Sequence, residues 1–234
     1  AEDKNLDITK IKGTGGNDRI TKLDIQRVES EGYDYEGETN TSNEATSSTA
    51  QSFDVSNIGE GLNPMRQRIA QNMRQSLNNT AQLTLHRKVD ADRLLDFKDR
   101  LSEELKDADQ DIKLTVTTLL AKAVVLALKE YGAMNARYEN GELTEYDDVH
   151  LGIATSLEDG LMVPVINNAD TKSIGTLAKE IKTSAKAVRE GNTGDVQLSG
   201  ATFTITNMGA SGIEYFTPIL NLGETGIIGV GDLA

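Results

Sequence analysis

Residues 151–166 read LGIATSLEDGLMVPVI, and this stretch decides the fold class. Two apolar runs, 151–156 and 161–166, flank the tripeptide Glu-Asp-Gly at 158–160, and a short polar connection ending in glycine is typical of a hairpin turn. The residues that follow, 173–189, place apolar side chains every three or four positions and predict an amphipathic helix. Strand and helix patterns therefore lie side by side in the chain.

The rest of the region 55–234 continues this mixture. Met65, Ile69, Met73 and Leu77 recur every four residues after Pro64, which predicts a one-faced helix. Two further helices are predicted, one at 90–106 with Asp90 as its cap and one at 115–131. Three further strands are predicted at 81–90, 201–206 and 226–230. This mixture favours an α/β or α+β domain over a helical bundle.

Composition divides the chain into three parts. Residues 1–30 form a small, comparatively basic module, and apolar periodicity returns from residue 55 and continues to 234. Between them, residues 29–52 contain no Ile, Leu, Val, Met, Phe, Lys or Arg. Such a segment buries too little apolar surface to offset its ordering entropy, so 31–54 is predicted to be a disordered acidic linker.

Charge and residue usage exclude several classes of function. The 24 Lys and Arg against 37 Asp and Glu give a net charge of −13, which disfavours a nucleic-acid surface. The absence of cysteine excludes disulfides and thiolate metal sites and fits a reducing cytoplasm. The most apolar window, 114–128, is interrupted by Lys122 and is too short to cross a membrane. We expect a cytoplasmic protein without a membrane partner.

The two histidines, His86 and His150, are the candidates for imidazole chemistry within these residues, so a multi-histidine metal site is not expected. His86 and Asp90 have His-x-x-x-Asp spacing, and hydrolysis at this pair is one alternative. However, His86 falls on the polar face of the predicted strand, which favours a solvated surface histidine. His150 is interpreted as a loop residue.

The N-terminal stretch 7–25, DITKIKGTGGNDRITKLDI, lacks the glycine spacing of a phosphate-binding loop. Thr21 and Asp24 resemble a capping box that opens a short helix at 22–28. Residues 5–25 resemble the latter part of the peripheral subunit-binding domain of 2-oxo-acid dehydrogenase complexes and depart from its pattern at 16–18. The resemblance implies binding of the decarboxylase or dihydrolipoamide dehydrogenase subunit, with Arg19, Lys12 and Lys22 as the partner-binding residues.

Residues 55–234 resemble the catalytic domain of the dihydrolipoamide acyltransferases of the same complexes. The resemblance rests on three stretches: NPMRQRIAQNM at 63–73, GIATSLEDGLMVPVINNAD at 152–170 and ATFTITNMGASGIEYFTPILN at 201–221. It implies a fold like that of chloramphenicol acetyltransferase, a mixed sheet flanked by helices, assembled as trimers that build a larger core. The implied reaction moves an acyl group from dihydrolipoyl to coenzyme A, with pyruvate as the expected 2-oxo acid.

The resemblance also assigns site residues. Thr206 occupies the position of the family's Ser or Thr that stabilises the tetrahedral oxyanion, whereas without the resemblance a Thr before Asn-Met-Gly indicates turn chemistry. Asn207, Gly209 and Gly212 are expected to shape the following loop. The family's catalytic His-x-x-x-Asp-Gly motif falls beyond the stretch that matches 226–234.

Two consequences follow for the 234 residues. We expect them to be inactive in acyl transfer by themselves, because the motif's histidine and aspartate are absent, as is the lipoyl domain that carries the lipoate. The alternative function is a non-catalytic scaffold or binding component of such a complex.

Overall fold

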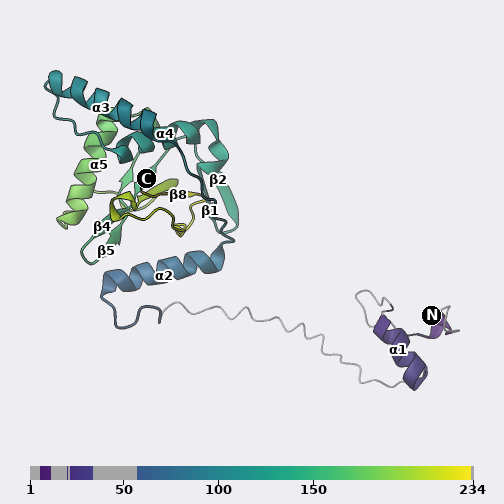
Figure 1. Ribbon diagram of the computed structural model, residues 1–234. Coiled ribbons are helices and arrows are strands. Elements are labelled where there is room, and N and C mark those ends of the chain that lie inside the picture. Colours follow the sequence, from purple (N-terminus) through teal and green to yellow (C-terminus); the bar gives the residue numbers. More distant parts are fainter. Residues whose placement is uncertain (1–5, 12–19, 21, 34–56, 233–234) are drawn as a thin grey trace. The chain divides into compact units, whose positions relative to one another are not determined.

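The structure, a computed structural model, describes residues 6–11, 20, 22–33 and 57–232 (Figure 1). The chain divides into two compact units, residues 1–54 and 55–234. Within the described residues no helix is long and apolar enough to cross a bilayer. The predicted linker 31–54 lies outside the described residues, apart from its first three positions.

The N-terminal unit contains a short 3-10 helix, η2 (Ile8–Lys10), and the helix α1 (Lys22–Glu31). Asp7 caps η2 by accepting a hydrogen bond from the Thr9 N–H at 3.1 Å. The Asp7 N–H donates to the Tyr33 hydroxyl at 2.6 Å, which ties the two pieces together. The helix predicted at 22–28 is confirmed and is three residues longer, whereas Thr21 of the predicted capping box is outside the described residues.

A four-stranded mixed sheet forms the centre of the larger unit, with the order β6-β3-β7-β8. β7 pairs in parallel with β3 and β8, and β3 pairs antiparallel with β6. The four strands are β3 (Leu151–Ile153), β6 (Val165–Ile166), β7 (Phe203–Asn207) and β8 (Ile227–Val230). Two hairpins flank it, β1 (Ala136–Glu139) with β2 (Glu142–Glu145), and β4 (Thr155–Leu157) with β5 (Gly160–Met162).

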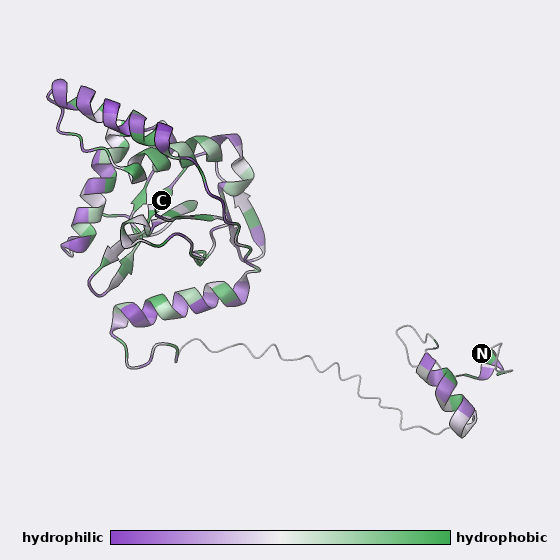
Figure 2. Ribbon diagram, viewed as in Figure 1, coloured by the Kyte–Doolittle hydropathy of each residue, from purple (hydrophilic) through white to green (hydrophobic). Residues whose placement is uncertain are grey.

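Helices cover the sheet and bury their apolar faces against it. α4 (Val116–Glu130) and α5 (Ile174–Arg189) bury Val125, Leu128 and Leu177 against the strands, as the green strands and inner helix faces show (Figure 2). α3 (Asp92–Asp107) packs on α4, and α2 (Pro64–Asn79) packs on β5 below the sheet in Figure 1. The predicted mixed α/β architecture is confirmed.

The hairpin predicted at 151–166 is divided into four short strands. β3 and β6 belong to the central sheet, whereas β4 and β5 leave it as a separate ribbon around the predicted turn. The chain leaves β3 at Ala154, whose N–H donates to the Ile205 carbonyl at 2.9 Å. Pro164 separates β5 from β6 and has no N–H to offer a strand ladder.

The strand predicted at 81–90 is wrong for this structure. The segment contains no strand residues, and its alternating apolar side chains are exposed: Leu83 by 82%, Leu85 by 84% and Val89 by 77%. Alternation supplies one apolar face, but a strand also needs a neighbour to satisfy its backbone, and no described strand pairs with this segment. Asp90 accepts from the Asp92 N–H at 2.9 Å, although Ala91 is the residue at the helix cap.

The β1–β2 hairpin was not anticipated from the sequence. Asn140 and Gly141 connect its strands and have φ angles of 53° and 85°. Both central positions of a type I′ turn require positive φ, which is why Asn-Gly is a strong hairpin signal. The signal is present in YENGELTEY at 138–146, where the flanking residues are mostly polar and do not resemble buried strands.

Candidate active site

Successive side chains of the central strand β7 point to opposite faces of the sheet. Phe203 and Ile205 point into the core beneath α4 and α5, whereas Thr204 and Thr206 line a cavity on the opposite face. Thr202, immediately before the strand, shares their alternation and is fully buried. Three threonine hydroxyls therefore follow one another along a single face of β7.

Two of these three hydroxyls are engaged. Thr202 Oγ1 donates to Asn135 Oδ1 at 2.6 Å and accepts from the His150 N–H at 3.1 Å. Thr204 Oγ1 donates to Glu224 Oε1 at 2.9 Å and accepts from Asn221 Nδ2 at 3.0 Å. Thr206 is half-buried, and within the described residues no hydrogen bond involves its hydroxyl. Its hydroxyl is thus available to a bound molecule.

The cavity that Thr206 lines has a volume of about 600 Å³, within the range of small-molecule sites. Its walls come from α2, the β4–β5 ribbon and the loop before β8. Most of the lining is apolar, including Met65, Ile69, Met73, Leu161, Val163, Phe216, Pro218 and Ile219. The polar part consists of nine side chains: Arg68, Asn72, Arg137, Ser199, Thr204, Thr206, Thr217, Asn221 and Glu224. Such a cavity suits a largely aliphatic ligand with a few polar atoms.

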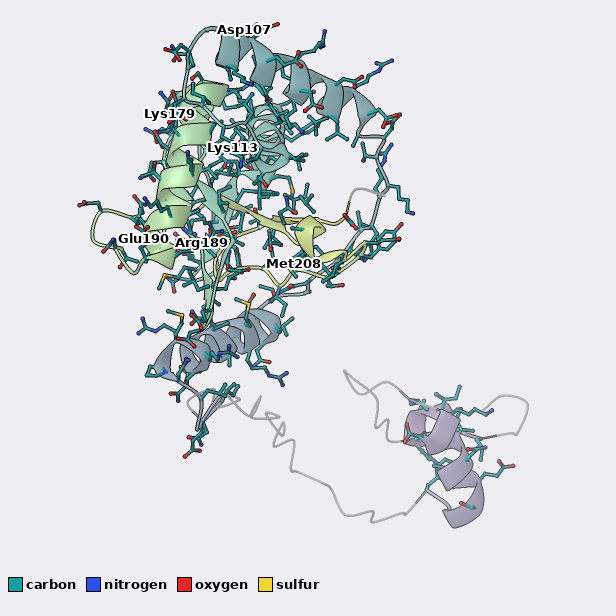
Figure 3. All side chains as sticks on the ribbon, turned by 60° about the vertical axis from the view of Figure 1, so that its left-hand side comes forward. Asp107, Lys113, Lys179, Arg189, Glu190 and Met208 are labelled. Atoms are coloured by element: carbon teal, nitrogen blue, oxygen red, sulfur yellow. The ribbon has the colours of Figure 1, made fainter. Side chains whose placement is uncertain are left out.

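The turn after β7 is shaped by Asn207. Its Oδ1 accepts from the Gly209 N–H at 2.8 Å, and its Nδ2 donates to Thr117 Oγ1 at 3.1 Å. Gly212 has a φ of 68°, a conformation that glycine adopts without strain. Met208, which is labelled in Figure 3, stands between Asn207 and Gly209 in this turn. The turn chemistry considered for Thr206 therefore belongs to its neighbour.

Glu224 is a buried acid on the cavity wall that the sequence analysis missed. The residue is only 6% exposed, and its Oε1 accepts from Thr204 and, at 3.1 Å, from Asn221. Among the described residues its Oε2 has no hydrogen-bond partner. Burial raises the pKa of Glu224 to about 7, against the opposing effects of Thr204, Asn221 and the charge of Arg137. An acid between two glycine-containing turns, NLGETG, gives no local signal of this role.

Arg137 holds together the segments around Glu224. From β1, its Nη1 donates to the Ala201 carbonyl at 2.6 Å and its Nη2 to the Leu222 carbonyl at 3.2 Å. The same guanidinium pairs with Glu139. The hairpin missed in the sequence therefore positions the loops on both sides of the cavity's polar part.

Neither histidine lines the cavity. His86 is exposed and contacts the Tyr215 ring edge-to-face, with 5.6 Å between ring centroids. His150 is half-buried, and its Nδ1 accepts from the Asn168 N–H at 3.3 Å. Within the described residues, no group of three or more acidic or histidine side chains could hold a metal ion. Because neither His86 nor Asp90 lines the cavity, the structure gives the hydrolytic alternative at this pair no support.

The predicted partner-binding residues are only partly described. Lys22 is exposed on α1. Lys12 and Arg19 lie outside the described residues.

Gly152 on β3 pairs with Thr204 on the neighbouring strand β7, and its replacement tests the packing between them. A Cβ at this position would lie 2.5 Å from Thr204 Oγ1 and 2.9 Å from Val163 Cγ1. We expect Gly152→Ala to lower the free energy of unfolding by about 1–3 kcal/mol, because the added methyl group would overpack the space between the two strands. Chemical denaturation measures this change. Gly194→Ala is the matched control, since its Cβ would meet no atom within 4 Å. An equal effect of the two substitutions would contradict the prediction.

Each of the two units matches a known protein family. Residues 50–234 match the model of the 2-oxoacid dehydrogenases acyltransferase (catalytic domain) family, and residues 1–26 match the e3 binding domain. The chain is 40% identical over 231 residues to the dihydrolipoyllysine-residue acetyltransferase component of the acetoin cleaving system of Bacillus subtilis. That match covers 99% of the chain and 55% of the relative, so the chain spans about half the relative's length.

Solved structures agree. One comes from work on the role of a serine, a histidine and an asparagine in the catalytic mechanism of Azotobacter vinelandii dihydrolipoamide acetyltransferase. It matches with a TM-score of 0.69 and 35% identity over 73% of this chain and 70% of that one. A structure of the cubic core of the pyruvate dehydrogenase multienzyme complex matches with a TM-score of 0.69 and 36% identity over the same shares. The expected acyltransferase fold is confirmed, and the chain belongs to the 2-oxoacid dehydrogenase acyltransferase family.

Proposed function

We propose that the complete protein is the acyltransferase core of a 2-oxo-acid dehydrogenase complex and transfers an acetyl group from a dihydrolipoyl arm to coenzyme A. The observation that carries this proposal is the Thr206 hydroxyl, which has no hydrogen bond among the described residues and lines an apolar cavity of about 600 Å³. The relative of the acetoin system and the Azotobacter structure are both named as acetyltransferases, which supports acetyl as the acyl group. Pyruvate remains the proposed 2-oxo acid.

Thr206 would act on the oxyanion. When the thiol of coenzyme A attacks a thioester, the carbonyl oxygen becomes negatively charged, and a fixed hydroxyl donor stabilises this charge more than the starting carbonyl. Thr206 can be that donor because Asn207 supplies the turn's hydrogen bonds. The Azotobacter work names a serine in the mechanism, and serine carries the same hydroxyl group.

The proton of the thiol needs a base. A general base must lie within hydrogen-bond reach of the proton that it removes, and neither His86 nor His150 lines the cavity. We therefore assign the base to the histidine of the family's His-x-x-x-Asp-Gly motif, which is not among these 234 residues. The apolar wall fits the methylene chain of the lipoyl arm, and lipoate supplies the thiol that carries the acyl group.

The test is an acetyl-transfer assay from S-acetyl-dihydrolipoamide to coenzyme A. We expect activity from the protein expressed from its complete reading frame and none from residues 1–234 alone. An inactive complete protein that still assembles would support the scaffold alternative instead. Supplying pyruvate with its decarboxylase, or acetoin with the enzyme that cleaves it, then distinguishes the two acyl sources.

The two units suggest a division of labour within a larger assembly. We propose a subunit-binding module at 1–30, a flexible linker at 31–54 and the catalytic domain at 55–234, with the catalytic domain forming trimers that build the core. The cubic-core structure supports a multimeric arrangement. Decarboxylase and dihydrolipoamide dehydrogenase subunits are the proposed partners, and the cytoplasm is the proposed location.

The N-terminal module offers a prediction about docking. If Arg19, Lys12 and Lys22 contact an acidic partner surface, Arg19→Ala should weaken binding of dihydrolipoamide dehydrogenase or decarboxylase, and raising the salt concentration should weaken it further. Isothermal titration calorimetry with the complete protein measures both effects. Lys113→Ala, an exposed charge in the other unit, is the control. Affinities that respond to neither Arg19→Ala nor salt would refute the assignment.

A further inference from the structure

We propose that Phe216 selects the size of the acyl group. Its ring closes the side of the cavity next to the Thr206 hydroxyl, so that an acetyl group fits there and a larger, branched group does not. Gly229 provides the space that the ring occupies. This role rests on the proposed function and names the residues that set its acyl specificity.

Gly229 lies on the cavity face of β8, directly beside Thr206. The parallel strands β7 and β8 pair Thr204 with Ile227 and Thr206 with Gly229. Ile227 lines the cavity, whereas Val230 packs against the hydrophobic core on the other face of the sheet. Because side chains alternate along a strand, residue 229 belongs to the same face as Ile227. Any side chain at position 229 would therefore enter the cavity next to the Thr206 hydroxyl.

The ring of Phe216 fills the space that a side chain at 229 would take. A Cβ on Gly229 would lie 2.8 Å from Phe216 Cζ, 3.1 Å from Cε2 and 3.2 Å from Cε1. These three atoms form the tip of the ring, and Phe216 also lines the cavity. Since neighbouring strands are about 4.8 Å apart, the ring tip lies within about 8 Å of the Thr206 Cβ. The half-buried ring therefore forms a wall beside the hydroxyl.

The strand on the other side of β7 contributes little bulk beside Thr206. Ala154 follows β3, one position beyond the pair of Ile153 and Ile205, and it lines the cavity with a single methyl group. A thioester whose carbonyl oxygen accepts from the Thr206 hydroxyl carries its acyl substituent one bond beyond the carbonyl carbon. That substituent lies between the methyl group and the ring. The ring is thus the neighbour that limits the size of the substituent.

The segment that carries Phe216 is fastened on both sides of the ring. Before the ring, the Ile213 carbonyl accepts from the Asp232 N–H at 2.8 Å. After it, the Leu220 N–H donates to Gln82 Oε1 at 3.3 Å. A wall that is held in place can exclude a larger group, whereas a mobile side chain would move aside for it.

The experiment measures kcat/KM of the complete protein for S-acetyl-dihydrolipoamide and S-isobutyryl-dihydrolipoamide, with coenzyme A as the acceptor. Isobutyryl carries two additional methyl groups, and a single carbon in an apolar pocket changes kcat/KM by about 10- to 200-fold. We expect the wild type to prefer acetyl by at least about 10-fold, and Phe216→Ala to lower this preference by about 10- to 200-fold. Phe216→Leu keeps part of the bulk and should lie between the two. It also provides the test if Phe216→Ala does not fold.

Two further variants separate the shape of the pocket from a merely structural role. Tyr215→Ala removes the adjacent ring, which is exposed and does not line the cavity, and it should leave the preference for acetyl unchanged. The double variant Phe216→Ala/Gly229→Val places apolar atoms back beside Thr206, where the ring tip has been removed. It should restore the preference for acetyl. A general loosening of the segment around 216 would not be reversed by a substitution on β8.

The outcomes distinguish this role from the proposed function. Acetyl transfer by the wild type with an unchanged preference in Phe216→Ala and Phe216→Leu would overturn the role of Phe216 and leave the proposed function standing. An equal change in Tyr215→Ala, or a double variant that accepts isobutyryl as readily as Phe216→Ala does, would also overturn it. A complete protein that transfers neither acyl group would overturn the proposed function and the acyl selection with it.

Discussion

Replacing Thr206 with valine in the complete protein is expected to lower kcat for acetyl transfer about 10²- to 10³-fold, the effect of deleting one oxyanion donor. Valine keeps the shape of threonine, and within the described residues the Thr206 hydroxyl makes no hydrogen bond that folding would miss. The loss should therefore appear in the chemical step rather than in stability. Steady-state assays with S-acetyl-dihydrolipoamide and coenzyme A measure it.

Two comparisons sharpen this test. Thr206→Ser restores a hydroxyl and should recover most of the activity, whereas Asn207→Ala should loosen the turn, because it removes the acceptor for the Gly209 N–H. Thermal denaturation separates the two substitutions, since only the second should change the melting temperature appreciably. An unimpaired Thr206→Val would remove the oxyanion role and leave Thr206 as an ordinary strand residue.

The second large effect concerns stability and pH. Because burial raises the pKa of Glu224 to about 7 from an ordinary value of 4.5, the folded protein binds the proton more tightly than the unfolded chain. The stabilisation is fully present below pH 4.5 and is lost as the pH rises through about 7. At about 1.4 kcal/mol per pKa unit, the loss is about 3 kcal/mol.

Glu224→Gln isolates this contribution. Glutamine cannot ionise, so the variant should lack this part of the pH dependence, while other titrating groups affect both proteins alike. Urea denaturation at pH 5 and pH 8 gives the difference. Arg137 and its partner Glu139 face the same region, so Glu139→Gln is measured as well, to show that the change does not arise from that pair. Parallel stability curves for wild type and Glu224→Gln would contradict a raised pKa.

Elements defined by local pattern could be predicted from the sequence. The helices α4 and α5 begin after Thr115 and Ser173, whose hydroxyls accept from the N–H groups three residues later, each at 3.1 Å. Their apolar repeats and caps lie within a few turns of chain, so one sequence contains the whole signal. The segment 81–90 shows the limit, because its alternation is also local but a strand's hydrogen-bonding partner is not.

In the candidate site, too, one residue could be predicted from a local stretch of sequence and the other could not. Thr206 was identified through a resemblance that spans a continuous stretch, and the structure places it beside the cavity. Glu224 could not be identified in that way, since its role depends on Thr204, twenty residues earlier in the chain, and on Arg137 from a hairpin still further away. Burial and an unpartnered oxygen are properties of the fold, and no spacing in the sequence encodes them.

The separate tasks of Thr206 and Asn207 have a consequence for engineering. Because the loop's shape depends on the asparagine and the candidate chemistry on its neighbour, position 206 can be varied without rebuilding the backbone. A cysteine there would be the only thiol in this chain, since the sequence contains no other. Thr206→Cys would therefore give a single attachment point, at which a maleimide-linked fluorophore or spin label would report directly on what enters the cavity.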